Sequence, residues 1–181
     1  VMHIRVESTG GSAWVDDVVF QVVTAPAPTP TPTPTTTPEP SSSVSVWLEA
    51  EEGDIQASAE PGTLPNLVSN ADMESGLWTS NAFAGTKPSP TWATDFRHSG
   101  AHALKMSSST YFYGSWDGTS MPVSPGQTYE LSMWVKTQAI TKGVSLNISW
   151  RDASNRSLSW ISSIGGKATG TNDWKQLLGS V

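Results

Sequence analysis

The sequence predicts an all-β fold, a sandwich of two antiparallel sheets. Only 14% of the 181 residues are charged, whereas Gly, Ser, Thr and Pro are abundant. This composition favours strands joined by turns over helices. Short apolar–polar alternations recur along the chain, with Gly, Pro, Asn or Ser turns between them. No helical period persists, so the elements below are all expected to be strands.

The first 23 residues predict two strands. In the opening VMHIRVE, Met2, Ile4 and Val6 alternate with polar side chains and so share one face. The sequence STGG then predicts a turn, and AWVDDVVFQVV reads as a second strand. Residues 1–23 are therefore expected to form a β-hairpin, which needs a larger sheet to join because an isolated hairpin is marginally stable.

Residues 24–43 have the composition of a linker. They read TAPAPTPTPTPTTTPEPSSS, with no large apolar residue. Alternating Pro and Thr favours an extended, semi-rigid spacer. Such Pro/Thr linkers resemble those of secreted polysaccharide-degrading enzymes and cell-surface proteins, so an extracellular location, secreted or on the cell surface, is expected. A further strand and a Gly/Pro-rich loop are expected over 44–65.

A regular series of strands is predicted from Asn66 to Val181. The strand-like runs are AHALKMS, TYFYGSW, QTYELSMWVKT, GVSLNISWRD, RSLSWISSI and DWKQLLGSV. The turns between them come at the short intervals of a sandwich. Residues 66–181 are therefore expected to form the main domain.

Several of these runs carry a family resemblance. NLVSNADMESGLW (66–78) resembles the opening pattern of the β-sandwich carbohydrate-binding modules of the family 4, 9, 16 and 22 group, although Ala71 and Met73 replace the usual Gly and Phe. HSGAHALKM, VSPGQTYELSMWVKT and TNDWKQL resemble later strands of that group, and the third is the strongest match. The resemblance implies a jelly-roll-like sandwich that binds polysaccharide. It leaves open which polysaccharide, with xylan, β-glucan and mannan all possible.

The closing motif of this group stands at the wrong end of the chain. Modules of the group end in a hairpin with the pattern W-I-D-D-V, which is missing after Val181 and resembles RVESTGGSAWVDDVVF within residues 1–23. In one interpretation, residues 1–23 end one module of a tandem array and 66–181 begin the next, C-terminally incomplete. In another, residues 1–23 complete the sandwich begun at Asn66, in the same chain or in a neighbouring copy, because an unfinished sheet edge invites strand addition.

The resemblance also implies a structural calcium ion. In the group, the Glu of the opening loop and the first Asp of the closing D-D pair supply ligands, and these positions are Glu74 and Asp16 here. Asp72 and Asp17 are possible helpers. Calcium prefers several hard oxygen ligands, which fits the residue types. The alternative is that the Asp pair caps a hairpin end and Glu74 is merely solvated.

Aromatic side chains that are not needed for the core are the candidate ligand platform, because indole and phenol rings stack on the flat faces of sugars. The candidates are Trp116, Trp134, Trp150, Trp160 and Tyr113. Arg151, Asp152 and Asn147 could add polar contacts. Core packing is the alternative for every one of these rings, and Trp78 and Trp174 match framework positions of the group.

Other function classes find little support. Residues 66–181 hold only seven acidic residues, mostly in turns, and the chain has no G-x-S-x-G motif, cysteine nucleophile or phosphate loop. It also has no basic stripe for nucleic acid and no apolar run long enough to enter a membrane. We therefore expect a non-catalytic carbohydrate-binding module of an extracellular multimodular protein. The alternative is a structural subunit of an extracellular fibre or array, in which residues 1–23 complete the sandwich of a neighbouring copy.

Overall fold

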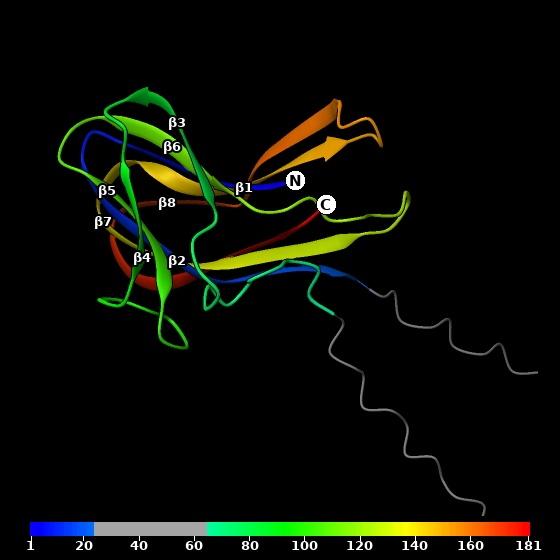
Figure 1. Ribbon diagram of the computed structural model, residues 1–181, viewed down its shortest axis with the longest axis horizontal. Coiled ribbons are helices and arrows are strands. Elements are labelled where there is room, and N and C mark those ends of the chain that lie inside the picture. Colours follow the sequence, from blue (N-terminus) through cyan, green and yellow to red (C-terminus); the bar gives the residue numbers. More distant parts are fainter. Residues whose placement is uncertain (24–64) are drawn as a thin grey trace, which may run out of the picture. The chain divides into compact units, whose positions relative to one another are not determined.

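The computed structural model describes residues 1–23 and 65–181, which form one compact unit (Figure 1). The expected linker at 24–43 and nearly all of the segment expected at 44–65 lie outside the described residues. The unit contains eight strands and no helix in its described part, so the predicted all-β class is confirmed. The strands are β1 (Met2–Ser8), β2 (Gly11–Val22), β3 (Thr79–Gly85), β4 (Ser89–Ala93), β5 (Ala103–Ser108), β6 (Phe112–Asp117), β7 (Tyr129–Arg151) and β8 (Ser157–Ser180).

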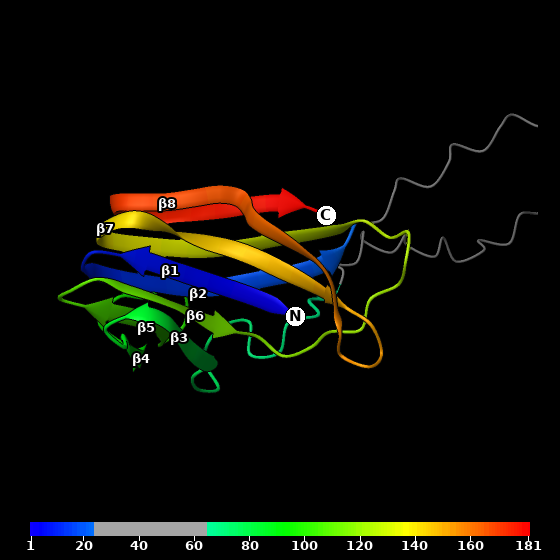
Figure 2. The same cartoon turned by 90° about the horizontal axis from the view of Figure 1, so that it is seen from above.

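Two long strands, β7 and β8, belong to both layers of the sandwich. The first part of β7 pairs with β2, over 129–138, and its later part pairs with β1, over 143–148. β8 runs antiparallel to β7 along both parts. One layer, the β1 sheet, therefore has the order β3-β6-β1-β7-β8, and the other, the β2 sheet, has the order β4-β5-β2-β7-β8. Figure 2 shows β7 and β8 on one side of β1 and β2, with β6 on the other side.

Each long strand bends where it leaves one sheet for the other. Ala139 in β7 has a φ of 56° and Gly170 in β8 has a φ of 80°. The register of the two strands also shifts here, between Thr137 and Val144. The sequence predicted a pair of separate strands in each of these regions, at 127–137 and 143–152 and at 156–164 and 173–181. The bends preserve that division inside continuous strands.

The N-terminal strands β1 and β2 take the central positions of the two sheets. They follow each other through the tight turn at Thr9 and Gly10, as expected, but they do not pair with each other. β1 lies between β6 and β7, and β2 lies between β5 and β7. The expected hairpin is thus an arch that carries the chain from one sheet to the other. Gly11, with φ 110°, is needed there because a Cβ would overlap the carbonyl of Gln138 in β7.

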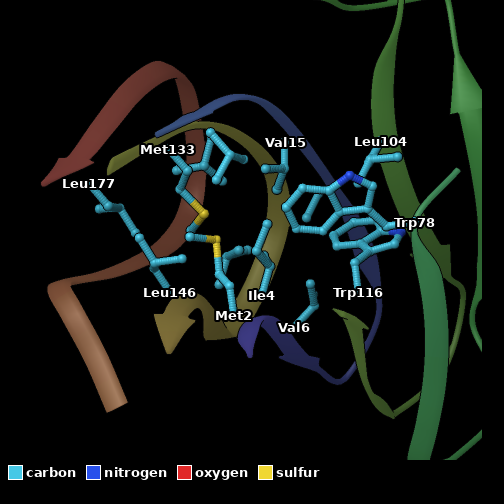
Figure 3. Close-up of a cluster of buried hydrophobic side chains, with 14 of the residues drawn as sticks. Met2, Ile4, Val6, Val15, Trp78, Leu104, Trp116, Met133, Leu146 and Leu177 are labelled. Atoms are coloured by element: carbon cyan, nitrogen blue, oxygen red, sulfur yellow. The ribbon is translucent and has the colours of Figure 1, made fainter. Parts of the chain in front are cut away.

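The core lies between the two sheets and draws on both parts of the described chain (Figure 3). Met2, Ile4 and Val6 of β1 point into it, and Val15 comes from β2. The residues of 65–181 that pack against them include Trp78, Leu104, Trp116, Met133, Leu146 and Leu177. Because successive side chains of a strand alternate between faces, His3, Arg5 and Glu7 point away from this core.

The structure adds two strands that the sequence pattern did not predict. β3 and β4 lie at the outer edges of the two sheets, where β3 pairs with β6 and β4 with β5. Their sequences, TSNAFAG and SPTWA, are short, rich in small residues and largely exposed. Because nearly all their side chains are exposed, these two edge strands lack the apolar alternation that marks a strand with one buried face.

Candidate functional site

The outward face of the β1 sheet gathers polar and aromatic side chains around β1. In the register of the sheet, Arg5 stands opposite Ser115 of β6 on one side and Ser145 of β7 on the other. The next strand, β8, places Lys167 opposite Ser145. Glu7 stands opposite Tyr113. These strands therefore bring side chains from four distant parts of the chain onto one surface.

Arg5 lies at the centre of this surface, among aromatic rings. Its guanidinium carbon is 4.2 Å from the ring centroid of Trp160 and 5.3 Å from that of Phe83. Its Nη1 donates a 2.6 Å hydrogen bond to the hydroxyl of Tyr113. Such cation–π contacts hold the side chain in place, since each is worth about 0.5–2 kcal/mol. Arg5 thus links Trp160 and Tyr113, two of the predicted platform residues.

A groove of about 250 Å³ opens around this arginine. We call it the Arg5 groove; it is lined chiefly by Arg5, Glu7, Tyr113, Asn147, Trp160 and Lys167. Trp160 is 38% exposed, so part of its ring is open to solvent, and the ring of His3 lies 4.7 Å from it on the protein side. Asn147 is buried and accepts a hydrogen bond from the backbone N–H of Ser163. The groove therefore combines an exposed indole with fixed polar groups.

Charged groups on this face are arranged in two hydrogen-bonded sets. Glu7 accepts hydrogen bonds from Lys142, at 2.9 Å, and from the hydroxyl of Tyr111, at 3.1 Å. The hydrogen bond from Lys142 is the main cause that holds the pKa of Glu7 below its ordinary value. The carboxylate is therefore ionised at neutral pH and neutralises Lys142.

The second set is centred on Asp117 at the other end of β1. Its Oδ1 lies 2.8 Å from His3 Nδ1 and its Oδ2 accepts a 2.6 Å hydrogen bond from Asn81. Burial acts to raise the pKa of Asp117, but the hydrogen bonds from His3 and Ser115 and the charge of His3 outweigh it, so that the pKa is lowered. Both oxygens of Asp117 are therefore taken up by contacts with His3, Ser115 and Asn81 on the β1 sheet.

The other predicted platform residues lie elsewhere. Trp116 is fully buried in the core between the sheets, so its ring is not available to a sugar. Trp134 is on the outward face of the β2 sheet, where His98 stacks on it at 3.9 Å. Trp150 is partly buried and packs against the core, beside a hollow of about 400 Å³ that is also lined by Val1 and Met121. Of the five predicted rings, the structure brings together only Trp160 and Tyr113.

The residues predicted as calcium ligands hold a loop in this structure. Both oxygens of Asp16 accept backbone hydrogen bonds, Oδ2 from His98 and Ser99 and Oδ1 from Asp17. Burial is the main cause that raises the pKa of Asp16, and these hydrogen bonds oppose it. The carboxylate therefore serves as an anchor for the 98–99 backbone.

Glu74 anchors the same loop a little further on. Its Oε1 accepts the N–H groups of Ala101 and His102, and its Oε2 lies 2.9 Å from His102 Nδ1. Asp72 accepts only the N–H of Glu74, at 3.3 Å, among the hydrogen bonds of the described residues. No group of three His, Cys, Asp or Glu side chains in the described ranges is arranged to hold a metal. The carboxylates of Asp16 and Glu74 are thus engaged by N–H and imidazole groups of this loop, and calcium binding stays a prediction.

Sequence reasoning missed Arg5, Glu7 and Lys167 as site residues. The alternation in VMHIRVE did place Arg5 and Glu7 on one polar face. Nothing in the sequence alone, however, showed that this face is flanked by Tyr113 on one side and Trp160 on the other. Those neighbours are set by the pairing of β1 with β6 and β7 and by the pairing of β7 with β8. Arg151 and Asp152, expected as polar contacts, bond to Asn155 and Arg156 in their own turn.

The comparison with protein families identifies the class of this domain. Residues 65–181 match the family CBM_4_9, described as a carbohydrate binding domain. The match covers more than half of the chain, and the chain belongs to this family, as the resemblance predicted. The family is typically non-catalytic. No curated protein and no solved structure matches the chain. In the described residues, no helix has the length and apolarity to cross a membrane.

Proposed function

We propose that the Arg5 groove is the sugar-binding site of this carbohydrate-binding domain, and that the domain holds a polysaccharide by aromatic stacking without catalysing a reaction. The observation that carries the proposal is the exposed ring of Trp160 beside Arg5 and Tyr113. A sugar ring presents C–H groups to an indole face and hydroxyls to the surrounding polar groups. Trp160 offers the first kind of contact, and Arg5 and Tyr113 offer the second.

The support for this site over the alternatives comes from exposure and rigidity. Trp160 is held by contacts with Arg5 and His3, so little side-chain entropy is lost when a ligand stacks on it. Trp134 is less exposed than Trp160, and the ring of His98 stacks on it in parallel at 3.9 Å. The hollow beside Trp150 is larger, but among the residues that line it Trp150 is the only aromatic besides the core residue Phe20.

The test is a pair of tryptophan substitutions on opposite sheets. Trp160→Ala should weaken binding to the recognised polysaccharide at least about tenfold, the loss expected for a residue at the centre of an interface, whereas Trp134→Ala should leave the affinity within about twofold. Binding is measured by affinity electrophoresis and calorimetry against xylan, β-glucan and glucomannan, after circular dichroism shows both variants to be folded. Loss of binding in Trp134→Ala alone would move the site to the β2 sheet.

The wider setting is part of the same proposal. The Pro/Thr-rich sequence at 24–43 is typical of linkers in secreted multimodular proteins, and this supports an extracellular module that keeps a partner domain near its polysaccharide. Detection of the protein in the medium or on the cell surface of its source, by antibody against the folded unit, tests the location.

A second candidate function is assembly between copies, and the position of β1 and β2 favours it. These strands are central in both sheets, yet 41 residues separate Val23 from Pro65. The same pairing could therefore be made with the β6, β5 and β7 of a neighbouring copy. Light scattering after size-exclusion chromatography, over a range of concentrations, tests this function: a mass of one chain throughout argues against it.

A further inference from the structure

The Arg5 groove carries positive charge that the protein does not neutralise. Three cationic side chains line it, Arg5, Lys142 and Lys167, against the single carboxylate of Glu7. Glu7 is paired with Lys142 at 2.9 Å. In the described residues, neither Arg5 nor Lys167 has a carboxylate oxygen within the 4.0 Å of an ion pair. The groove is thus left with two uncompensated cations.

The positive charge of the Arg5 groove is not part of a general positive charge of the folded unit. All ten Lys and Arg residues and ten of the sixteen acidic residues fall within 1–23 and 65–181, so the folded unit carries no formal net charge. Apart from Glu7, the strands paired with β1 place an acidic residue on this face at Asp117, which stands opposite His3 and not opposite Arg5. Both of its oxygens are already engaged by His3, Ser115 and Asn81. It does not neutralise the groove.

Arg5 is also prepared to bind an anion. Its Nε is buried and has no hydrogen-bond partner, and the one hydrogen bond of its side chain in the described residues goes from Nη1 to Tyr113. Nη2 likewise has no hydrogen bond in the described residues, and a guanidinium N–H meets a carboxylate or sulfate oxygen with a charge-assisted hydrogen bond. The surrounding rings of Trp160 and Phe83 fix the plane of the guanidinium in advance.

The spacing of the two free cations suits a chain of sugars. Arg5, Ser145 and Lys167 occupy directly opposite positions on three adjacent strands. Neighbouring strands lie about 4.8 Å apart, so the two backbones are separated by roughly 10 Å across the groove. A polymer lying across β1, β7 and β8 would pass both cations while its sugar rings meet Trp160.

The geometry points to an anionic polysaccharide as the ligand: the Arg5 groove binds a sugar residue that carries a carboxylate, as in a uronic acid, or a sulfate ester, with Arg5 and Lys167 as the anion-binding groups. This inference rests on the proposed function and narrows its ligand class. Because the folded unit has no net charge, recognition depends on these two side chains and not on a general attraction to polyanions.

The experiment compares each polymer with its own neutral form. The full chain is titrated with glucuronoxylan and polygalacturonate and with the same polymers after chemical reduction of their carboxyl groups to alcohols. We expect affinity to fall at least about tenfold on reduction, which corresponds to about 1.4 kcal/mol. Equal binding to the native and reduced polymers would overturn the inference and leave the proposed function intact. Binding to none of the charged or neutral polymers would sink the proposed function itself.

Dextran sulfate and dextran form the second arm, which separates the two sources of charge. Preference for the sulfated polymer, with no response to the uronates, assigns the site to sulfate esters. This assignment requires that the substitutions at Arg5 and Lys167 described below abolish the preference for dextran sulfate.

The variants identify the groove as the origin of the preference. Lys167→Gln changes an exposed side chain and should weaken binding to the anionic polymer about three- to tenfold, with a smaller salt dependence. Arg5→Lys keeps the charge but loses the planar fork, and should cost at least as much. Lys136→Gln, on the outward face of the β2 sheet, where Lys136 is ion-paired with Asp173, is the control for charge outside the groove and should leave binding unchanged. If Lys136→Gln weakens binding as much as Lys167→Gln does, the anion site is not the Arg5 groove.

Discussion

Substitution of Ile4 by Ala tests whether the N-terminal strand is a central part of the fold. Ile4 is fully buried, and in the register of the β1 sheet it stands between Trp116 and Leu146. The change removes three carbon atoms, which at about 0.8 kcal/mol per buried CH₂ gives about 2.4 kcal/mol from transfer alone. The cavity left between the sheets raises the expected loss to about 2–5 kcal/mol.

The assay is urea unfolding followed by tryptophan fluorescence, together with a thermal melt. At roughly 3 °C per kcal/mol for a unit of this size, the melting temperature should fall by about 6–15 °C. Leu158→Ala is the matched control: it also removes three carbon atoms, but Leu158 is 65% exposed, so its cost should stay below about 0.5 kcal/mol. If Ile4→Ala costs no more than Leu158→Ala, β1 does not occupy the core position described above.

Three further predictions concern the loop anchors and the N-terminal strands. The pKa of Glu74 is held below its ordinary value of 4.5, chiefly by the hydrogen bond from His102, so its stabilising effect is complete above pH 4.5 and is lost as the pH falls through the lowered pKa. We expect the fluorescence of Trp92, which stacks on His102 at 3.7 Å, to change in that acidic window in the wild type and not in Glu74→Gln. Because N–H and imidazole groups engage all four oxygens of Asp16 and Glu74, adding calcium or EDTA should shift the melting temperature by less than about 1 °C; a clear rise with calcium would restore the metal site that the resemblance implies. A chain that lacks residues 1–23 should fail to give a cooperative unfolding transition, and a separate 1–23 peptide should restore it; a folded truncated chain would contradict the central position of β1 and β2.

Much of the secondary structure follows from side-chain alternation. In β1 and in each of the two parts of β7 the residues that face the core are apolar and occur at every second position, and in β1 these positions are all buried, as Met2, Ile4 and Val6 show. Alternation is a local property that survives folding, because it fixes the two faces of a strand relative to each other. The family resemblance, which rests on short motifs in a fixed order, was also within reach of the sequence.

The exposure of individual aromatic residues could not be predicted from the sequence. Trp14 lies on the outward face of β2, yet it is almost fully buried, because the loop after β4 folds back and packs Phe96 against it at 5.1 Å. The same loop brings His98 onto Trp134. Periodicity shows on which side of its own strand a ring lies, but it cannot show whether a distant loop covers that side.

The sequence by itself determined the all-β class, the alternating faces of the strands and the kinds of side chain available to a ligand. Only the tertiary structure decided which of these side chains meet. Arg5 reaches Tyr113 and Trp160 because β1 inserts between β6 and β7, a pairing across more than 100 residues that depends on strand register and on the bends in β7 and β8. Register and layer are set by the packing of all strands at once, and no local stretch of sequence contains that information.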